Sequence, residues 1–179
     1  MDARQSKRRA NIPRAVSLHD AAQDPSAGHF RSLTLFDKSA GTACAARNMV
    51  GACLQDWGLD HMVDDGRLVV SELVGNVVHH AVPDDCLTLP GAARRIDVLV
   101  KAWPGWLFIG VADEDSTPPD LPAREFVSPE LVGDFSEALL PDQGRGLLII
   151  QRLADAVWWS PKGPGGKTVW VRFDLDSAT

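Results

Sequence analysis

The longest amphipathic pattern in the chain runs from Val63 to Ala81 and predicts a central helix. At about 100° per residue, its apolar side chains fall on one broad arc. These are Val63, Val70, Leu73, Val74, Val77 and Val78. Val is only a fair helix former, and Gly costs roughly 1 kcal/mol relative to Ala. We therefore expect the helix to draw its stability from packing against a core.

Shorter patterns predict two further helices and a set of strands. Apolar and polar residues alternate in each strand, and Pro104-Gly105 between two strands predicts an antiparallel hairpin. An Ala-rich helix begins at a cap at Asp37 or Ser39 and ends at Trp57. The predicted strands cover residues 31–36, 95–103, 106–113, 158–159 and 167–175, and a buried helix covers residues 144–157.

The order of these elements is strand, helix, helix, hairpin, long loop, helix, hairpin. Helices mixed with antiparallel strands predict an α+β fold, a two-layer sandwich whose mixed, mostly antiparallel sheet has helices on one face. A length of 179 residues suits one domain with a full core. We expect that domain to span residues 28–179. Residues 1–27 are basic and polar at the start and predict a disordered tail.

Charge and cysteine content narrow the classes of function. The formal net charge of -6 argues against direct nucleic-acid binding, which needs a concentrated basic surface. Cys44, Cys53 and Cys86 lack metal-ligand spacing and cannot all pair within one chain, which indicates reduced thiols in the cytoplasm. No apolar run approaches membrane-spanning length. A small anionic ligand, held locally, remains possible.

One edge of the central helix carries polar residues that could take part in binding or catalysis. Glu72, Asn76 and His80 are spaced four apart and so share one side of the helix. Glu72 is the only formally charged side chain between Leu68 and Ala81, which brings a carboxylate, an amide and an imidazole beside the core. The alternative is that these residues are the solvent-exposed side of an amphipathic helix.

An acidic cluster follows the second strand of the predicted hairpin. Asp113, Glu114 and Asp115 stand where the chain leaves the sheet, and a carboxylate there could accept a hydrogen bond from a buried ligand amine. The alternatives are an acidic turn before Pro118-Pro119 and a metal site. Three consecutive residues cannot all point the same way on a strand, which counts against the metal site.

A glycine pair precedes the helix over residues 144–157. Gly144 and Gly146 would expose backbone N–H groups at the positive end of that helix, where anions bind. Arg145 between them could add a charge-assisted contact to a phosphate. An isolated G-x-G is usually only a turn. The segment Gly163–Thr168 ends like a P-loop, but Pro161 replaces its first glycine and a strand follows, so we interpret it as a turn.

The segment from Ser116 to Gln143 carries five prolines and little apolar periodicity. It is too long for a simple connection within a compact domain. Long loops of this kind serve as lids or binding loops, or are disordered. This one lies between the acidic cluster and the glycine pair.

Taken together, four stretches resemble the ATP-binding domain of bacterial anti-sigma factor serine/threonine kinases, stand-alone relatives of histidine-kinase ATPase domains in the Bergerat-fold superfamily. They are S-E-L-V-G-N-V-V-H-H-A, V-A-D-E-D-S-T-P-P, D-Q-G-R-G-L-L-I-I-Q-R-L-A-D-A-V-W-W and G-G-K-T-V-W-V. The resemblance covers roughly residues 30–175. Four motifs in the right order are far more specific than any one of them. Residues 118–143 would then be the ATP lid.

The resemblance implies roles for the polar edge of the central helix. Glu72 matches the acidic residue that acts as general base, and Asn76 matches the asparagine that coordinates Mg²⁺. An amide oxygen suits Mg²⁺, which takes few protein ligands and shares the rest with phosphates and water. His80 matches a histidine on the phosphate side. Gly75 stands where relatives usually have a small polar residue.

The resemblance also implies how the nucleotide is held. Asp113 matches the aspartate that recognises the adenine amino group, while Gly144 and Gly146 match the glycine box that cradles the phosphates. The histidine-kinase form of the first glycine box, D-x-G-x-G, is absent, and the acidic, proline-rich form of anti-sigma kinase relatives stands in its place. The implied nucleotide-binding set is Asn76, His80, Asp113, Gly144, Arg145, Gly146, Leu147 and Thr168.

Three functions remain open at this point. The first is a Mg-ATP-dependent kinase that phosphorylates Ser or Thr on a partner, an anti-sigma factor antagonist, and sequesters a sigma factor. The second is a binding module that uses the same nucleotide pocket as a switch and transfers no phosphate. The third is a structural α+β domain without a ligand. Retention of Glu72 favours the first function over the second, and relatives suggest a homodimer.

Overall fold

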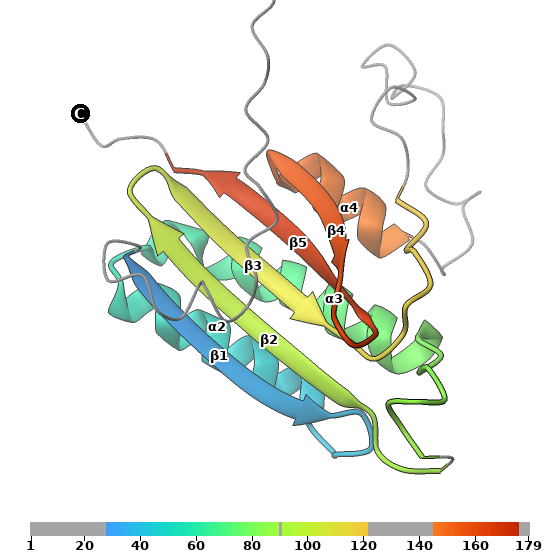
Figure 1. Ribbon diagram of the computed structural model, residues 1–179. Helices are drawn as coiled ribbons and strands as arrows, with labels where there is room; N and C mark the ends of the chain where they lie inside the picture. Colours follow the sequence, from blue (N-terminus) through green and yellow to red (C-terminus); the bar gives the residue numbers. More distant parts are fainter. Residues whose placement is uncertain (1–27, 90, 122–144, 176–179) are drawn as a thin grey trace, which may run out of the picture.

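The computed structural model describes residues 28–89, 91–121 and 145–175, which form two layers (Figure 1). A five-stranded sheet forms one layer, and the helices lie together on one face of it. The strands are β1 (His29–Phe36), β2 (Arg95–Trp103), β3 (Trp106–Ala112), β4 (Ala156–Pro161) and β5 (Lys167–Asp174). The helices are α2 (Thr42–Asp56), α3 (Val63–His80) and α4 (Arg145–Leu153), with a 3₁₀ turn η1 (Asp60–Met62) before α3. The predicted α+β two-layer fold is confirmed.

The strand order in the sheet is β1-β2-β3-β5-β4. Every strand pairing among the described residues is antiparallel, whereas the sequence predicted a mixed sheet. The reason is the position of β5. The crossover through α4 makes β4 run parallel to β3, but the β4–β5 hairpin inserts β5 between them. No parallel neighbours result.

Two predicted boundaries differ from the structure. The predicted helix over residues 144–157 ends at Leu153, and β4 begins at Ala156. The β-branched and aromatic run that starts at Val157 pairs with β5, so tertiary pairing overrides the helical periodicity. The first helix begins at Thr42 rather than at a cap at Asp37 or Ser39, because residues 37–41 form turns. The Thr42 hydroxyl lies within hydrogen-bond distance of the carbonyl oxygens of Phe36 (2.7 Å) and Ser39 (2.8 Å).

Some sequence predictions fall outside the described residues. The predicted tail, residues 1–27, does so entirely, as do Gly144 and most of the predicted lid, residues 118–143. Within the described part of the chain, every helix is too short or too polar to span a membrane. The three cysteines are free, with Cys53 buried and the other two exposed.

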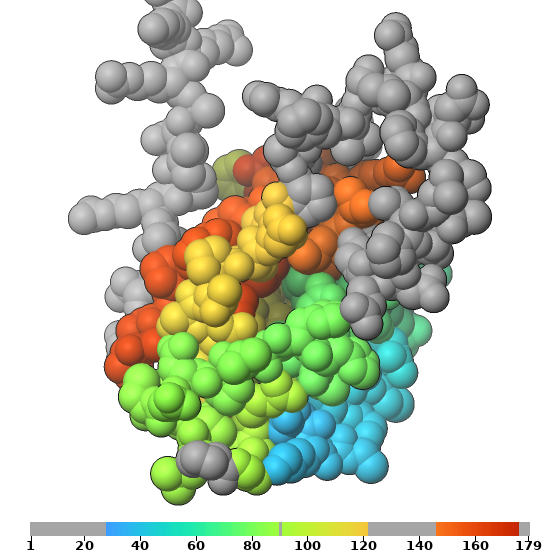
Figure 2. All heavy atoms as spheres, turned by 90° about the vertical axis from the view of Figure 1, so that its right-hand side faces the viewer, coloured from blue at the N-terminus to red at the C-terminus, as the bar shows by residue number. Residues whose placement is uncertain are grey.

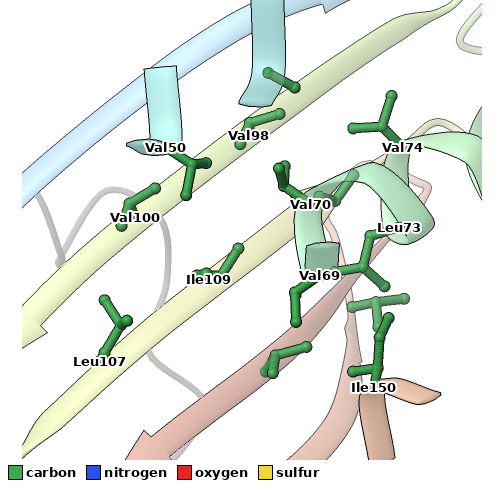
Figure 3. Packing of buried hydrophobic residues seen from close by; sticks show 14 of the residues in the cluster. Val50, Val69, Val70, Leu73, Val74, Val98, Val100, Leu107, Ile109 and Ile150 are labelled. Atoms are coloured by element: carbon green, nitrogen blue, oxygen red, sulfur yellow. The ribbon is translucent and has the colours of Figure 1, made fainter. Parts of the chain in front are cut away.

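The core lies between the sheet and the helices (Figure 3). Val70 and Leu73 of α3 face the middle of the sheet, and Ile150 of α4 packs near Leu73. The predicted apolar arc of α3 is buried, apart from Val78, which is partly buried against the same core. Burying a Val or Leu side chain contributes about 1.5–3 kcal/mol. Packing thus stabilises this helix, whose residues mostly have low helix propensity.

Glycines let α2 and α3 pack closely. A Cβ atom at Gly66 of α3 would lie 2.6 Å from the Leu54 Cδ1 atom of α2 and 3.4 Å from the Ile109 Cδ1 atom of β3. The contact with Leu54 is too short for a well-packed interior, so Leu54 would have to shift to make room for a side chain. The absence of a side chain at Gly66 therefore sets how deeply α3 sits between α2 and the sheet.

The opposite face of the sheet carries a row of aromatic rings. Trp103 and Phe108 meet edge to face at 5.3 Å between ring centroids, Phe108 and Trp158 at 6.2 Å, and Trp158 stacks on Trp170 at 6.4 Å. Trp170 lies across β3 above Gly110, where a Cβ atom would come within 2.5 Å of its ring. This row accounts for three of the six tryptophans of the chain.

Candidate active site

A pocket of about 470 Å³ opens at the end of the sheet where β3 leaves it and β5 enters. In Figure 2, the segment after β3 (yellow) lies on one side of this region and the C-terminal part of α3 (green) on the other, with a hollow between them. This volume lies in the usual range for small-molecule sites. The lining residues are Leu73, Asn76, Val77, His80, Ala81, Val111, Asp113, Asp115, Thr117, Pro118, Pro119, Asp120, Leu147, Lys167 and Val169.

The polar edge of α3 forms one wall of this pocket. Asn76 is half-buried and His80 is exposed, and both line the pocket because they are four residues apart on the helix. Glu72, one turn earlier, is half-buried but is not part of the pocket lining. Its carboxylate lies against α4 instead, directly over Gly146. The three residues therefore lead from the pocket to the first turn of α4.

The acidic cluster divides between the two sides of the chain. Asp113 and Asp115 are buried and line the pocket, whereas the Glu114 carboxylate accepts hydrogen bonds from the Thr88 hydroxyl (2.5 Å) and the Arg95 N–H (3.0 Å) outside it. β3 ends at Ala112, and Glu114 lies at a bend between the two aspartates. The three carboxylates therefore do not all face the pocket.

Asp113 and Asp115 share a buried counter-charge, Lys167, which was not among the predicted site residues. The Lys167 Nζ atom lies 3.1 Å from Asp113 Oδ2, 3.2 Å from Asp115 Oδ2 and 2.9 Å from the Asp115 carbonyl oxygen. The Asp113 N–H also donates to the Lys167 carbonyl oxygen, which fixes the two backbones side by side. Side chains this buried are rarely charged unless they are paired. We call this group of Asp113, Asp115 and Lys167 the triad. It carries a formal charge of -1 on the pocket floor.

The two carboxyl groups differ in electrostatics. Burial raises the pKa of Asp113, and the Lys167 charge only partly offsets this effect. Burial also acts on Asp115, but hydrogen bonds from Thr117 and from the Val82 N–H outweigh it and lower the pKa of that carboxyl. Both Asp115 oxygens are occupied by these donors, since Thr117 N–H binds Oδ1 and Val82 N–H binds Oδ2. Asp113 lines the pocket, and its Oδ2 atom, with Lys167 as its partner, can accept a further hydrogen bond.

Three loops meet next to the triad through Asp84. The Ser116 hydroxyl donates to Asp84 Oδ2 at 2.5 Å, and the Gly166 N–H donates to the Ser116 Oγ atom at 2.7 Å. The Ser116 side chain and backbone and the Gly166 N–H thereby lower the pKa of Asp84. This contact fastens the loop after α3, the end of the acidic cluster and the β4–β5 turn. Gly166 adopts a positive φ of 83° and has its backbone against the Asp113 carbonyl, which only glycine allows.

The predicted glycine pair is described only in part. Gly146 is buried in the first turn of α4, and the Glu72 carboxylate occupies the space that a side chain there would need. Leu147 lines the pocket. Gly144 and the side chain of Arg145 lie outside the described residues.

The structure does not bring Thr168 to the pocket. Thr168 is buried, but Lys167 and Val169 on either side of it line the pocket while Thr168 does not. Successive side chains of a strand point to opposite faces, so Thr168 lies on the sheet face that carries Trp170. Lys167 is therefore the residue of G-G-K-T that faces the ligand space. The signal that could have identified it is a lysine in phase with the apolar Val169, Val171 and Phe173.

The donor set fits Mg²⁺ only as a metal shared with a ligand. No group of three or more His, Cys, Asp and Glu side chains suited to a metal occurs in the described ranges. Asn76 offers one amide oxygen at the pocket wall. Mg²⁺ is often bound by one or two protein oxygens together with phosphates and water, so this arrangement suits a metal that enters with a nucleotide.

Comparison with known families agrees with this geometry. A family model described as the histidine kinase-like ATPase domain matches residues 37–173, which include α3, the acidic cluster, α4 and both closing strands. Comparison with curated proteins gives no match. The chain therefore belongs to the histidine kinase-like ATPase domain family and is an ATP-binding domain.

Proposed function

We propose that this chain is a protein serine/threonine kinase of the anti-sigma factor type, which transfers the γ-phosphate of ATP to a Ser or Thr of a partner protein, an anti-sigma factor antagonist. The observation that carries the proposal is the position of Glu72. Its carboxylate lies one helical turn from Asn76 and against the first turn of α4. A base is thus available beside the expected phosphate end of the pocket.

Each residue has a defined part in this reaction. Asp113 accepts a hydrogen bond from the adenine amine, and the first turn of α4 faces the phosphates with its N–H groups. Asn76 would hold Mg²⁺, which neutralises phosphate charge when bound. Glu72 takes the proton of the attacking Ser or Thr hydroxyl while the oxygen of that hydroxyl bonds to the γ-phosphorus. The bond from that phosphorus to the β,γ-bridging oxygen breaks, and ADP leaves.

The test replaces Glu72 by Gln, which keeps the shape and removes the base. We expect nearly unchanged Mg-ATP affinity by calorimetry and a loss of phosphate transfer of about 10²- to 10⁴-fold. The assay uses labelled ATP and the partner that co-purifies with the chain, identified by mass spectrometry. Asp64→Asn is the matched control, because Asp64 is an exposed acid on the same helix. It should leave both quantities unchanged.

One outcome would favour a different function. If the wild-type protein binds ATP and the partner but transfers no phosphate with any divalent metal, the kinase proposal is wrong. The same pocket would then serve a binding module whose affinity for the partner changes with the bound nucleotide. Partner affinity measured with ATP and with ADP would establish that switch.

A further inference from the structure

We propose that Lys167 is a positioning residue for base selection: its ammonium group keeps Asp113 in the ionised form, which can only accept hydrogen bonds. The pocket then selects a purine with an amino group at C6 over one with a carbonyl group there. The inference deepens the proposed function, because it rests on ATP binding in this pocket. It assigns a role to a lysine in the P-loop-like segment Gly163–Thr168.

The contacts of Lys167 leave it no proton for a ligand. Its three N–H groups have acceptors in the Asp113 carboxylate, Asp115 Oδ2 and the Asp115 carbonyl oxygen, all within 3.3 Å. The side chain is 7% exposed, so it has little freedom to turn elsewhere. A purine carbonyl at this position would find no donor from Lys167. What the floor of the pocket offers is the remaining acceptor capacity of Asp113.

The same contacts determine which carboxyl group would take up a proton without Lys167. Two buried carboxylates without a counter-charge cannot both remain ionised at neutral pH. Asp115 accepts backbone N–H groups on both oxygens, and these contacts favour its ionised form. Asp113 accepts one backbone N–H, from Asp115, and is the more deeply buried of the two. The proton would therefore go to Asp113.

Protonation changes what Asp113 can recognise. A carboxylate accepts from the adenine amine and repels the carbonyl oxygen of hypoxanthine. A carboxylic acid can instead donate its proton to that carbonyl oxygen. ATP and ITP differ in the group at C6 and the proton on N1, so their affinity ratio reports the protonation state of Asp113 directly. Other ionisable groups that line the pocket are His80, Asp115 and Asp120. They are present in wild type as well, so comparison with wild type accounts for their titration.

The experiment measures Mg-ATP and Mg-ITP affinities by calorimetry at about pH 6, 7 and 8. Wild type should prefer ATP throughout. In Lys167→Met, the preference should fall about tenfold or more at the acidic end and recover as the pH rises. Adding Asp115→Asn removes the neighbouring carboxylate but leaves burial, the largest influence that raises the pKa of Asp113, so the double variant should regain only part of its preference for ATP. Asp113→Asn is the reference, since its amide can donate or accept and should show little preference at any pH.

A purely structural role for Lys167 predicts a different result. Lys167→Met would then weaken both nucleotides equally at every pH, and that outcome overturns the inference. Lys167→Gln carries the same expectation as the Met variant, so the test stands if Lys167→Met does not fold. If wild type binds neither nucleotide, the proposed function itself fails. If ATP binds and the ATP-to-ITP affinity ratio is the same in the Lys167 variants as in wild type, only the inference fails.

Discussion

At the scale of single residues, chemically identical groups differ because of their neighbours. Asp113 and Asp115 are two residues apart and contact the same ammonium group, yet burial raises the pKa of Asp113 while backbone donors lower that of Asp115. Backbone N–H groups stabilise a carboxylate without adding charge to the site. Asp115 thus serves as a fixed structural anion, and Asp113 is the carboxylate that can accept a further hydrogen bond.

Gly146 is the residue whose substitution should affect chemistry more than folding. In Gly146→Ala, the new methyl group would meet the Glu72 carboxylate, which is half-buried and able to turn away. Ala is favoured over Gly in a helix by about 1 kcal/mol, so thermal stability should not fall. Displacement of the base should lower phosphate transfer by about tenfold or more.

Gly75→Ala is the matched control for that experiment. Gly75 lies on α3 beside Asn76, and a Cβ atom there would meet no atom within 4 Å. We expect a gain of about 0.5–1 kcal/mol in unfolding free energy with transfer unchanged. Full transfer activity in Gly146→Ala would show that the position of the Glu72 carboxylate is not needed.

At the scale of elements, Arg94 joins the ends of three of them. Its guanidinium group donates to the carbonyl oxygens of Val78 (2.9 Å) and Ala81 at the C-terminus of α3, where a cation is favourable. It also pairs with Asp37, which follows β1, at 2.6 Å, while its own backbone leads into β2. The end of α3, from which His80 faces the pocket, is thereby fixed to the sheet.

Asp37→Asn should reveal this junction through its pH dependence. Burial opposes ionisation of Asp37, but Arg94 outweighs it and lowers the pKa below 3.8. A lowered pKa contributes stability above the unfolded value, and that stability is lost as the pH falls through the folded value. At neutral pH the variant should lose about 1–3 kcal/mol of unfolding free energy. In acid, below the folded pKa, it should match wild type.

Urea denaturation of both proteins at neutral and acidic pH measures this difference. Asp85→Asn is the control, because Asp85 is exposed in the loop after α3 and should change the unfolding free energy by less than about 0.5 kcal/mol. A constant gap between Asp37→Asn and wild type at all pH values would mean that the charge of Asp37 has no part in the effect.

At the scale of the whole molecule, one core joins the sheet to helices α2, α3 and α4. Ile109, in the central strand β3, is fully buried and lies beneath Gly66 of α3. Ile109→Ala should cost about 2–5 kcal/mol, a large part of the roughly 5–15 kcal/mol that stabilises a typical domain. Far-ultraviolet circular dichroism in denaturant should show one cooperative transition at a lower midpoint.

Trp106→Ala tests whether that cost comes from burial rather than from the size of the deleted side chain. Trp106 begins the same strand and is 48% exposed. Its removal deletes more atoms but leaves a smaller cavity, so it should shift the midpoint less than Ile109→Ala does. A larger shift for Trp106→Ala would place the main source of stability on the sheet rim.

Local patterns along the sequence determined the elements and much of the pocket wall. The 3.6-residue period identified α3 and put Asn76 and His80 on one side of it, because a helix fixes that relation by itself. The turn at Pro104-Gly105 fixed the β2–β3 hairpin and so brought Asp113 to the end of a strand. These relations involve residues close in the chain, which is why periodicity and turn chemistry were sufficient.

The tertiary structure decided everything that depends on residues distant in the chain. Only the pairing of β5 beside β3 brings Lys167 to Asp113, 54 positions earlier, and only the approach of α4 to α3 brings Gly146 against Glu72. The pairing of β4 with β5 ended α4 at Leu153, where helical periodicity alone continued to Val157. The physical reason is that burial and hydrogen bonding are set by three-dimensional neighbours. A single strand or helix therefore carries no local sign of which carboxylate will be paired, buried or free.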